Sequence, residues 1–348
     1  MDALIGPVRP PTGTASESEG PTAGRGQTEI RVKGSPVRVP SVQIGERTVI
    51  ATGKWLKVAA LRDEELIEGD SVEDPSRFVP ILKDSGLSAD LFTFGQRVPD
   101  CSHKYNYCTE WENAAAIPIT DFSHWWKDCA EYSIRKAVNR AKKSSVTVTI
   151  TEFNDKLVEA ICRIYNETPV RQGKLFWHYK KDFHLVKREL ATYLDRSIFI
   201  GAYYEDELIG FMKITWVGTT GTITQILSMR KHFDKRPNNA MIAKAVEICA
   251  SGGKSHFIYG SYVYYDSNSS LTEFKRRNGF EAVPLPRYYI PLTLKGRFAL
   301  KLGFHRGLAA NTPKPVMKAF LRARKLWIER RVKSYEGRRQ RQRVTEAN

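Results

Sequence analysis

Hydrophobic and polar residues alternate in short runs near the start of the chain, which predicts a small β-rich region. The apolar runs lie at residues 30–32, 37–39, 48–50 and 55–58, and turn pairs such as Gly34-Ser35 separate them. Residues 1–28 are rich in Gly, Pro, Ser and Thr with almost nothing apolar to bury, which is typical of a disordered lead-in. Residues 62–110 predict only a short helix near residues 78–82. No internal repeat is apparent.

The C-terminal two-thirds of the chain has longer periodic segments. Helical spacing of apolar residues predicts helices at 128–143, after the capping residue Asn154, and at 182–195, 238–250, 270–277 and 315–332. Alternation predicts strands at 146–151, 197–204, 208–217, 222–230, 256–263, 280–283 and 288–292. Short hairpins demand antiparallel pairing, and helical crossovers supply a parallel step. The order predicts an α/β (α+β) fold, a mixed and mostly antiparallel sheet of about seven strands flanked by helices.

The composition is that of a globular protein. Of the 348 residues, 41% are hydrophobic, and no stretch approaches the roughly 20 consecutive apolar residues of a membrane-spanning helix. The first residues lack the basic head and apolar core of a signal peptide. Five cysteines fit reduced thiols. These features predict a cytoplasmic protein without a transmembrane segment.

Positive charge is concentrated at one end of the chain. The formal net charge is +17, and residues 295–348 hold 16 Lys and Arg against 3 Asp and Glu. Such a tail attracts polyanions, including RNA and anionic membrane surfaces. The alternative interpretation is a solvated helical end that keeps the protein in solution.

One group of residues has the side-chain types of metal ligands. It consists of Cys101, His103, Cys108, His124 and Cys129. Structural zinc sites usually contain a tight Cys-x2–4-Cys pair, which this group lacks. The sequence therefore predicts no metal site.

The segment from residue 226 to residue 240 is the first candidate for ligand binding. A strand that feeds a helix N-terminus leaves backbone N–H groups and the positive end of the helix dipole facing outward, which suits a phosphate or pyrophosphate. Lys231, Lys235 and Arg236 add positive charge there, and Pro237 suits the first helical turn because it lacks a donor. The alternative is an ordinary capped core helix preceded by solvated charges.

The element order over residues 146–293 resembles the GNAT acyltransferase superfamily. Its pyrophosphate loop has a basic residue or Gln, then Gly three positions later and Gly or Ala five positions later; Lys235, Asn238 and Ala240 hold these places, so the central glycine is missing. Its second motif matches Asn268, Leu271, Phe274-Lys275 and Gly279-Phe280. The resemblance implies that acetyl-CoA or another acyl-CoA serves as co-substrate, contacted by Leu227, Met229, Lys235, Arg236, Asn238, Asn239, Ala240 and Asn268.

A second resemblance follows from Lys275, which stands where many GNAT enzymes have a tyrosine. The run Phe-Lys-x-x-x-Gly-Phe and the upstream basic helix at residues 133–143 resemble the Fem-type (FemAB-like) peptidoglycan aminoacyl transferases. In those proteins the donor is an aminoacyl-tRNA, and a lysine at this place is thought to stabilise charge on the reacting centre. They usually contain two copies of the domain, and this chain has room for one full copy and at best a reduced one before residue 125.

Taken with these resemblances, the sequence divides into four parts. They are the lead-in at 1–28, the β-rich region at 29–125, a GNAT-like acyltransferase domain at 126–294, and a basic C-terminal helix and tail at 295–348. The resemblance implies a gap between two splayed strands, here residues 226–229 and 259–263, in which the acyl carbonyl binds.

Candidate catalytic residues follow from the chemistry of amide formation. The amine must lose a proton, and the carbonyl oxygen and leaving group must be stabilised. Lys275 is the candidate for charge stabilisation, with a solvated lysine as the alternative. His178 is a candidate general base, or else a loop histidine packed among aromatic residues. Tyr262 is the third candidate, from a tyrosine-rich segment at the exit of the strand at 256–263.

The loop at residues 167–181 is expected to shape the acceptor side. Glu167, Arg171 and Trp177 are its candidate substrate-binding residues, and Arg171 suits a carboxylate or phosphate. The expected activity is transfer of an acyl group, acetyl from acetyl-CoA, to a small-molecule or peptide amine. One alternative is Fem-type transfer from aminoacyl-tRNA to a cell-wall precursor or peptide. The other is an inactive acyltransferase fold that binds RNA or anionic membrane through its tail.

Overall fold

The computed structural model describes residues 24–32, 35–171, 173–264 and 269–306. The expected helix at 315–332, most of the basic tail, nearly all of the lead-in and Asn268 lie outside these ranges. The lead-in nevertheless contributes structure, because the first strand begins at Gly24. Within the described residues, no helix has both the length and the apolar character needed to cross a bilayer.

The N-terminal half is built from strands with one complete α-helix. In chain order it contains β1 (Gly24–Val32), β2 (Ser35–Ile44), β3 (Arg47–Thr52), β4 (Val58–Leu61), the 3-10 turn η1 (Glu64–Leu66), α1 (Pro75–Asp84), β5 (Leu91–Gly95) and β6 (Cys108–Pro118). The side chain of Asp74 caps α1 by accepting from the amides of Ser76 and Arg77. This is the short helix expected near residues 78–82.

The C-terminal half carries more helices. It contains α2 (Phe122–His124), η2 (Trp125–Cys129), α3 (Tyr132–Lys143), β7 (Thr147–Thr151), α4 (Asp155–Asn166), β8 (Val170–Arg171), β9 (Lys174–Leu175), α5 (Phe183–Leu190), η3 (Leu194–Arg196), β10 (Ser197–Tyr204), β11 (Glu207–Val217), β12 (Thr220–Ser228), η4 (Arg230–Lys235), α6 (Pro237–Ser251), β13 (His256–Ser261), α7 (Ser270–Arg277), β14 (Glu281–Pro291), α8 (Leu294–Lys301) and η5 (Phe304–Arg306). The expected cap at Asn154 is confirmed, because its side chain accepts from the amide of Leu157 at 3.0 Å.

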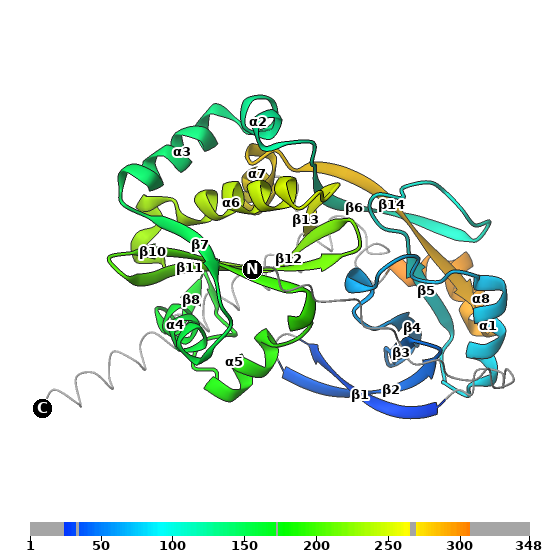
Figure 1. Ribbon diagram of the computed structural model, residues 1–348. Helices are drawn as coiled ribbons and strands as arrows, with labels where there is room; N and C mark the ends of the chain where they lie inside the picture. Colours follow the sequence, from blue (N-terminus) through cyan, green and yellow to red (C-terminus); the bar gives the residue numbers. More distant parts are fainter. Residues whose placement is uncertain (1–23, 33–34, 172, 265–268, 307–348) are drawn as a thin grey trace, which may run out of the picture.

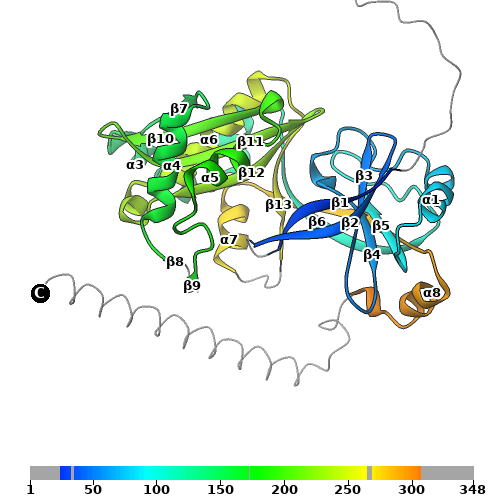
Figure 2. The same ribbon diagram turned by 90° about the horizontal axis from the view of Figure 1, so that it is seen from below.

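Helices cover both faces of the sheet in the C-terminal half (Figure 1). The helices α3 and α6 pack on one face over a core that includes Met212, Ile242 and Val246. The helices α4 and α5 pack on the other face against Phe199 and Phe211. A separate core under α1 fills the N-terminal half. Figure 2 shows the two halves next to each other.

One sheet of 12 strands runs through both halves, in the order β1-β2-β3-β4-β5-β14-β6-β13-β12-β11-β10-β7. The pairs β4·β5 and β12·β13 are parallel, and the other neighbours are antiparallel. The expected sheet of about seven, mostly antiparallel strands is corrected to this mixed sheet of 12, because β1–β6 extend it. The two closing strands expected at 280–283 and 288–292 are also one strand, β14, which contains Pro284 and Pro286.

Read outward from its centre, the sheet has the same order of pairings in both directions. The series β14-β5-β4-β3-β2-β1 matches β6-β13-β12-β11-β10-β7, including the parallel pair in second position. The helix α1 joins β4 to β5 just as α6 joins β12 to β13. The two halves exchange their last strands, because β6 pairs with β13 and β14 pairs with β5. The N-terminal half is therefore a reduced topological copy of the C-terminal half. This agrees with the room for a reduced copy before residue 125, although no repeat is apparent in the sequence itself.

Candidate functional site

The parallel strands β12 and β13 part soon after they begin. They pair at only three positions, Thr220↔His256, Gly221↔Phe257 and Thr222↔Ile258. Beyond these, residues 223–228 of β12 and 259–261 of β13 have no registered pairing with each other. Gly260 takes a φ of 55°, which favours glycine and redirects β13. The gap expected between these strands is confirmed.

This gap opens into a cavity of about 1110 Å³ between the two halves. Residues 222–224 of β12 and Ile258, Gly260 and Ser261 of β13 line one side. The opposite side comes from residues 62–66 after β4 and residues 95–98 after β5. A cavity of this size accommodates an ordinary small-molecule ligand.

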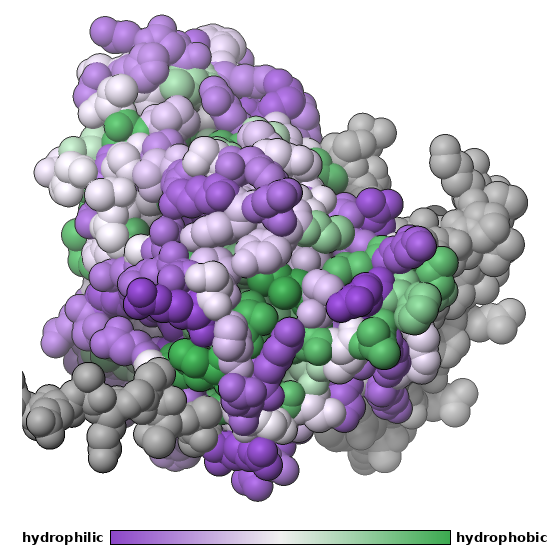
Figure 3. All heavy atoms as spheres, turned by 90° about the vertical axis from the view of Figure 1, so that its right-hand side faces the viewer, coloured by the Kyte–Doolittle hydropathy of each residue, from purple (hydrophilic) through white to green (hydrophobic). Residues whose placement is uncertain are grey.

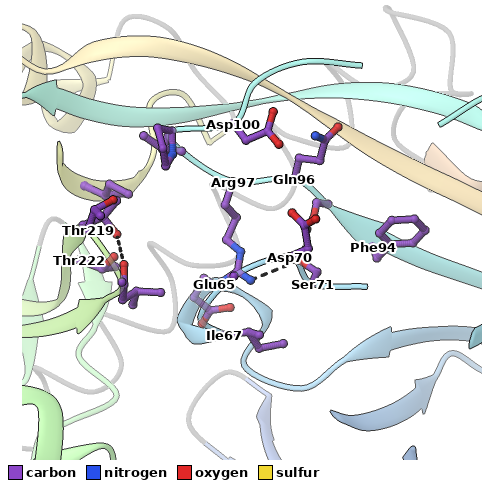
Figure 4. A pocket seen from close by; sticks show the side chains of 18 of the residues that line it. Glu65, Ile67, Asp70, Ser71, Phe94, Gln96, Arg97, Asp100, Thr219 and Thr222 are labelled. Carbon is purple, nitrogen blue, oxygen red and sulfur yellow. Dashed lines mark hydrogen bonds between the residues drawn. The ribbon is translucent and has the colours of Figure 1, made fainter. Parts of the chain in front are cut away.

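A second cavity of about 490 Å³ continues from the first and shares Glu65, Gln96, Arg97 and Thr222 with it. Arg97 extends from the end of β5 toward Glu65 and Ser71, and Thr222 lies on the opposite wall (Figure 4). The Arg97 guanidinium donates to Ser71 Oγ at 3.3 Å, whereas its Nη1 has no hydrogen-bond partner in the described part of the chain. The Nε2 of the buried Gln96 side chain is unpartnered in the same way.

The charges on the cavity walls are perturbed by burial. Burial lowers the pKa of the Arg97 guanidinium, with Glu64 and Glu65 opposing this effect. Desolvation of the carboxyl raises the pKa of Glu65, although the residue as a whole is exposed. Lys213 is almost fully covered and donates to the carbonyl of Leu190 at 2.8 Å, and burial lowers its pKa to about 8. None of these residues was singled out from the sequence.

The matching gap in the N-terminal half is filled by a side chain. Strands β4 and β5 also pair at three positions, and β4 ends one residue later, at Leu61. The amide of Gly95 donates to Glu64 Oε1 at 2.8 Å, and Arg287 Nη2 donates to Glu64 Oε2 at 2.8 Å. The Glu64 carboxylate thus occupies the backbone donor that this gap offers. Of the two related gaps, the one between β12 and β13 is the candidate site.

Lys275 lies directly behind this gap. The helix α7 holds its side chain fully buried, and Nζ donates to the carbonyl of Ser261 at 2.6 Å. The ammonium also lies 4.5 Å from the ring centre of Tyr259 and 4.8 Å from that of Tyr264. Burial lowers the pKa of Lys275 to about 8. Ser261 and Tyr264 line the large cavity, so one residue separates the lysine from it.

Tyr262 is anchored through its backbone. Its amide donates to the carbonyl of Asn113 at 3.2 Å, and its carbonyl accepts from Thr272 Oγ1 at 3.4 Å. Its half-buried ring packs against the main core rather than lining either cavity. Tyr262 therefore lies near Lys275 in the fold, but its side chain lines neither cavity.

The start of α6 offers donors and a mixed charge pattern. Arg236 takes a φ of 58° before Pro237 and gives the first turn no side-chain cap. The side chain of Asn239 donates to Asn278 Oδ1 at 3.3 Å, and Ala240 is buried next to it. The Oδ1 of Asn238 is buried without a partner in the described chain.

Two of the basic residues before α6 are neutralised. Lys231 pairs with Glu207 at 2.8 Å and Lys235 with Asp234 at 3.5 Å. Arg236 is exposed, and of the three it is the one without an ion pair within the described ranges. Leu227 and Met229 belong to the core under α4 and α5.

Glu167 and Arg171 form an ion pair beside the end of β12. The Glu167 carboxylate accepts from the amides of Arg230 at 2.7 Å and Lys231 at 2.8 Å, and it pairs with Arg171 at 3.1 Å. Arg171 also donates to the carbonyls of Ser228 and Ile164. Neither residue lines the large cavities. Their contacts fix the loop after β12 from within the protein.

His178 and Trp177 lie in an aromatic cluster away from the cavities. The His178 ring centre is 3.6 Å from that of Trp177 and 4.3 Å from that of Tyr165. Burial lowers the pKa of His178 to about 3, so the ring is neutral at ordinary pH. Trp177 is half-exposed, with the ammonium of Lys181 4.1 Å from its ring centre.

Comparison with known proteins identifies the fold. No protein-family model and no curated protein matches the chain. Among solved structures, FemX has 10% sequence identity and a TM-score of 0.52, and the match covers 77% of this chain and 88% of FemX. L-PGS from Bacillus licheniformis has 14% identity and a TM-score of 0.48, over 70% of this chain and 81% of that one. A tandem GNAT protein from the clavulanic acid pathway has 8% identity and a TM-score of 0.41, over 79% and 85%.

At these identities the likeness concerns the fold alone. The chain has the fold of FemX, which agrees with the Fem-type resemblance of the run around Lys275.

Proposed function

We propose that the protein transfers an acyl group from an activated donor to an amine, and that the reaction takes place where β12 and β13 part. The observation that carries this proposal is the opening of that gap into a cavity of about 1110 Å³ between the halves. Strand edges in the gap offer backbone N–H groups to an acyl carbonyl, and the cavity gives the amine a route to the carbonyl carbon.

The favoured donor is acetyl-CoA or another acyl-CoA, acting as co-substrate. The residues that would hold its diphosphate are those of the first turn of α6, where no side chain caps the amides and Arg236 is an exposed cation. The thioester would reach the gap along β12. Bound acyl-CoA would supply the acyl group and leave as the CoA thiolate.

Lys275 is the residue we assign to charge stabilisation. Its Nζ is held on the carbonyl of Ser261, one residue behind the cavity wall, and at pH 7 its pKa of about 8 leaves it mostly protonated. A buried ammonium acts on developing negative charge more strongly than an exposed one, because little water screens it. It therefore stabilises the carbonyl oxygen or the leaving group electrostatically.

The acceptor is assigned to the cavities on the far side of the gap. Glu65 has a raised pKa and faces both cavities, which suits a group that takes a proton from an incoming ammonium. Arg97 and Gln96 add unpartnered donors nearby, which suits an acceptor that also carries a carboxylate. An amine bearing a carboxylate is the acceptor class that these charges fit.

A second candidate donor, aminoacyl-tRNA, is favoured by one specific observation. The Glu167 carboxylate already occupies the amides of Arg230 and Lys231, at the place where the loop after β12 would otherwise offer donors to a diphosphate. Lys275 in the Fem-type position points the same way. The acceptor would then be a cell-wall precursor or a peptide.

Two titrations separate these donors. Saturable thermal stabilisation by CoA supports the first donor, because a ligand that binds only the native state raises its stability. Tight binding of charged tRNA with a steep salt dependence, and no response to CoA, supports the second. The proposal of acyl transfer fails if neither donor yields acylated product with a panel of amines and amino acids, since an inactive fold would then remain.

A further inference from the structure

An apolar stripe on α8 faces solvent. Leu294, Phe298 and Leu302 follow one another at four-residue spacing, and 69%, 65% and 59% of their surfaces are exposed. Trp55, with 61% of its surface exposed, and Phe304 extend the stripe, their ring centres 5.5 Å apart in an edge-to-face arrangement. Figure 3, which faces the side where α8 lies, shows hydrophobic residues gathered beside strongly hydrophilic ones. We call these five residues the α8 stripe.

The packing of α8 forces this stripe outward. Gly296 and Ala299, on the opposite face of the helix, are buried. A Cβ added to Gly296 would lie 1.9 Å from the carbonyl oxygen of Asp90, so the helix backbone sits directly on the chain before β5. The side chain of Thr293 caps the helix by accepting from the Gly296 amide. The orientation of α8 is therefore fixed, and the α8 stripe cannot turn into the core.

Cations flank the stripe. At 100° per residue, Lys301 and Arg297 lie on one side of Leu294, Phe298 and Leu302. Lys295 lies on the other side, where its ammonium pairs with Asp90 at 3.1 Å. The chain then continues through residues 307–348, which contain 12 Lys and Arg against 3 Asp and Glu. An apolar face with aromatic residues, bordered by Lys and Arg, is the pattern of a helix that lies in a membrane interface.

We propose that the α8 stripe docks into the surface of an anionic lipid bilayer. The leucines, Phe298 and Trp55 enter the boundary between headgroups and acyl chains, while Arg297 and Lys301 contact the negative headgroups. RNA and acidic proteins fit the cations but give the apolar side chains nothing to enter. This surface is distinct from the cavities, so the proposal holds or fails independently of acyl transfer.

The test is co-sedimentation of the full chain with vesicles. One set contains phosphatidylglycerol and phosphatidylcholine in about equal amounts, and the other contains phosphatidylcholine alone. The double variant Phe298→Ser/Leu302→Ser removes two apolar side chains that are exposed, so the fold should be unaffected. Ile150→Ser is the matched control, because Ile150 is an exposed apolar residue on β7 with 53% of its surface exposed.

Wild type and Ile150→Ser should bind the anionic vesicles, and the double variant should partition about ten-fold or more weakly. Equal binding by the double variant would overturn the proposal, because charge alone would then suffice. A wild-type dimer that the double variant converts to a monomer would also overturn it, since a second copy would cover the stripe. So would a marked loss of thermal stability in the double variant, which would show that the chain itself covers these side chains.

Discussion

Replacing Lys275 by methionine tests whether its amine is desolvated as the structure indicates. Methionine keeps most of the side-chain volume among Tyr259, Tyr264 and the carbonyl of Ser261 but removes the charge. Burial lowers the pKa of the lysine from 10.5 to about 8. At about 1.4 kcal/mol per pKa unit, the buried ammonium costs the native state about 3 kcal/mol at neutral pH.

That cost depends on pH in a defined direction. Below pH 8 the lysine is protonated in both the native and the unfolded protein, and the full cost is present. Between pH 8 and 10.5 the unfolded state binds more protons than the native state, so the free energy of unfolding rises with pH. The rise due to Lys275 should amount to about 2 kcal/mol between about pH 7 and about pH 9.5.

The assay is urea denaturation of wild type and Lys275→Met at a series of pH values across this window. The free energy of unfolding of wild type relative to the variant should increase with pH. Lys156→Met, on the exposed side of α4, is the control and should give a constant difference. A constant difference for Lys275→Met as well would refute the reasoning. In turnover, Lys275→Met should lower kcat by about ten-fold or more with little change in donor binding.

Three further predictions concern residues around the site. His178→Phe should leave the pH dependence of kcat/KM unchanged between about pH 5 and about pH 8, because a histidine with a pKa of about 3 does not titrate there. If the variant loses an inflection that the wild-type pH profile shows in this range, His178 acts as a general base after all. Glu167→Gln should lower the free energy of unfolding by about 2 kcal/mol, measured in urea, because Arg171 and two amides lose their anion. Glu64→Gln should destabilise the protein to a similar extent, about 2 kcal/mol, without changing donor affinity, since Glu64 fills the other gap; reduced donor affinity would contradict the assignment of the gaps.

The C-terminal half was largely predictable because its pattern is local. The strand at 197–204 and the helix at 270–277 have the expected bounds, since alternation and caps mark their ends. The separation of β12 from β13 was expected through the resemblance to the GNAT superfamily. The prolines at 284 and 286 misled the prediction because β14 tolerates them within one continuous strand.

The N-terminal half was not predictable in the same way. Its copy of the fold has lost most helices, so only α1 marks the crossover between β4 and β5. Its last strand is supplied by β14, nearly 200 residues away in the chain, and such exchange leaves no periodic signal. The cavity residues Glu65, Gln96 and Arg97 come together only through this sheet. The signal available in the sequence for these cavity residues was the polar pair Gln96-Arg97 just after β5.

Direct observation of a bound donor tests the central claim most sharply. The measurement is a crystal structure of the protein with a non-reactive thioether analogue of acetyl-CoA. The acyl group should lie between residues 223–228 of β12 and 259–261 of β13, with the diphosphate at the first turn of α6. If β12 and β13 were hydrogen-bonded along their whole length, or if the acyl group were bound elsewhere, this account would be contradicted.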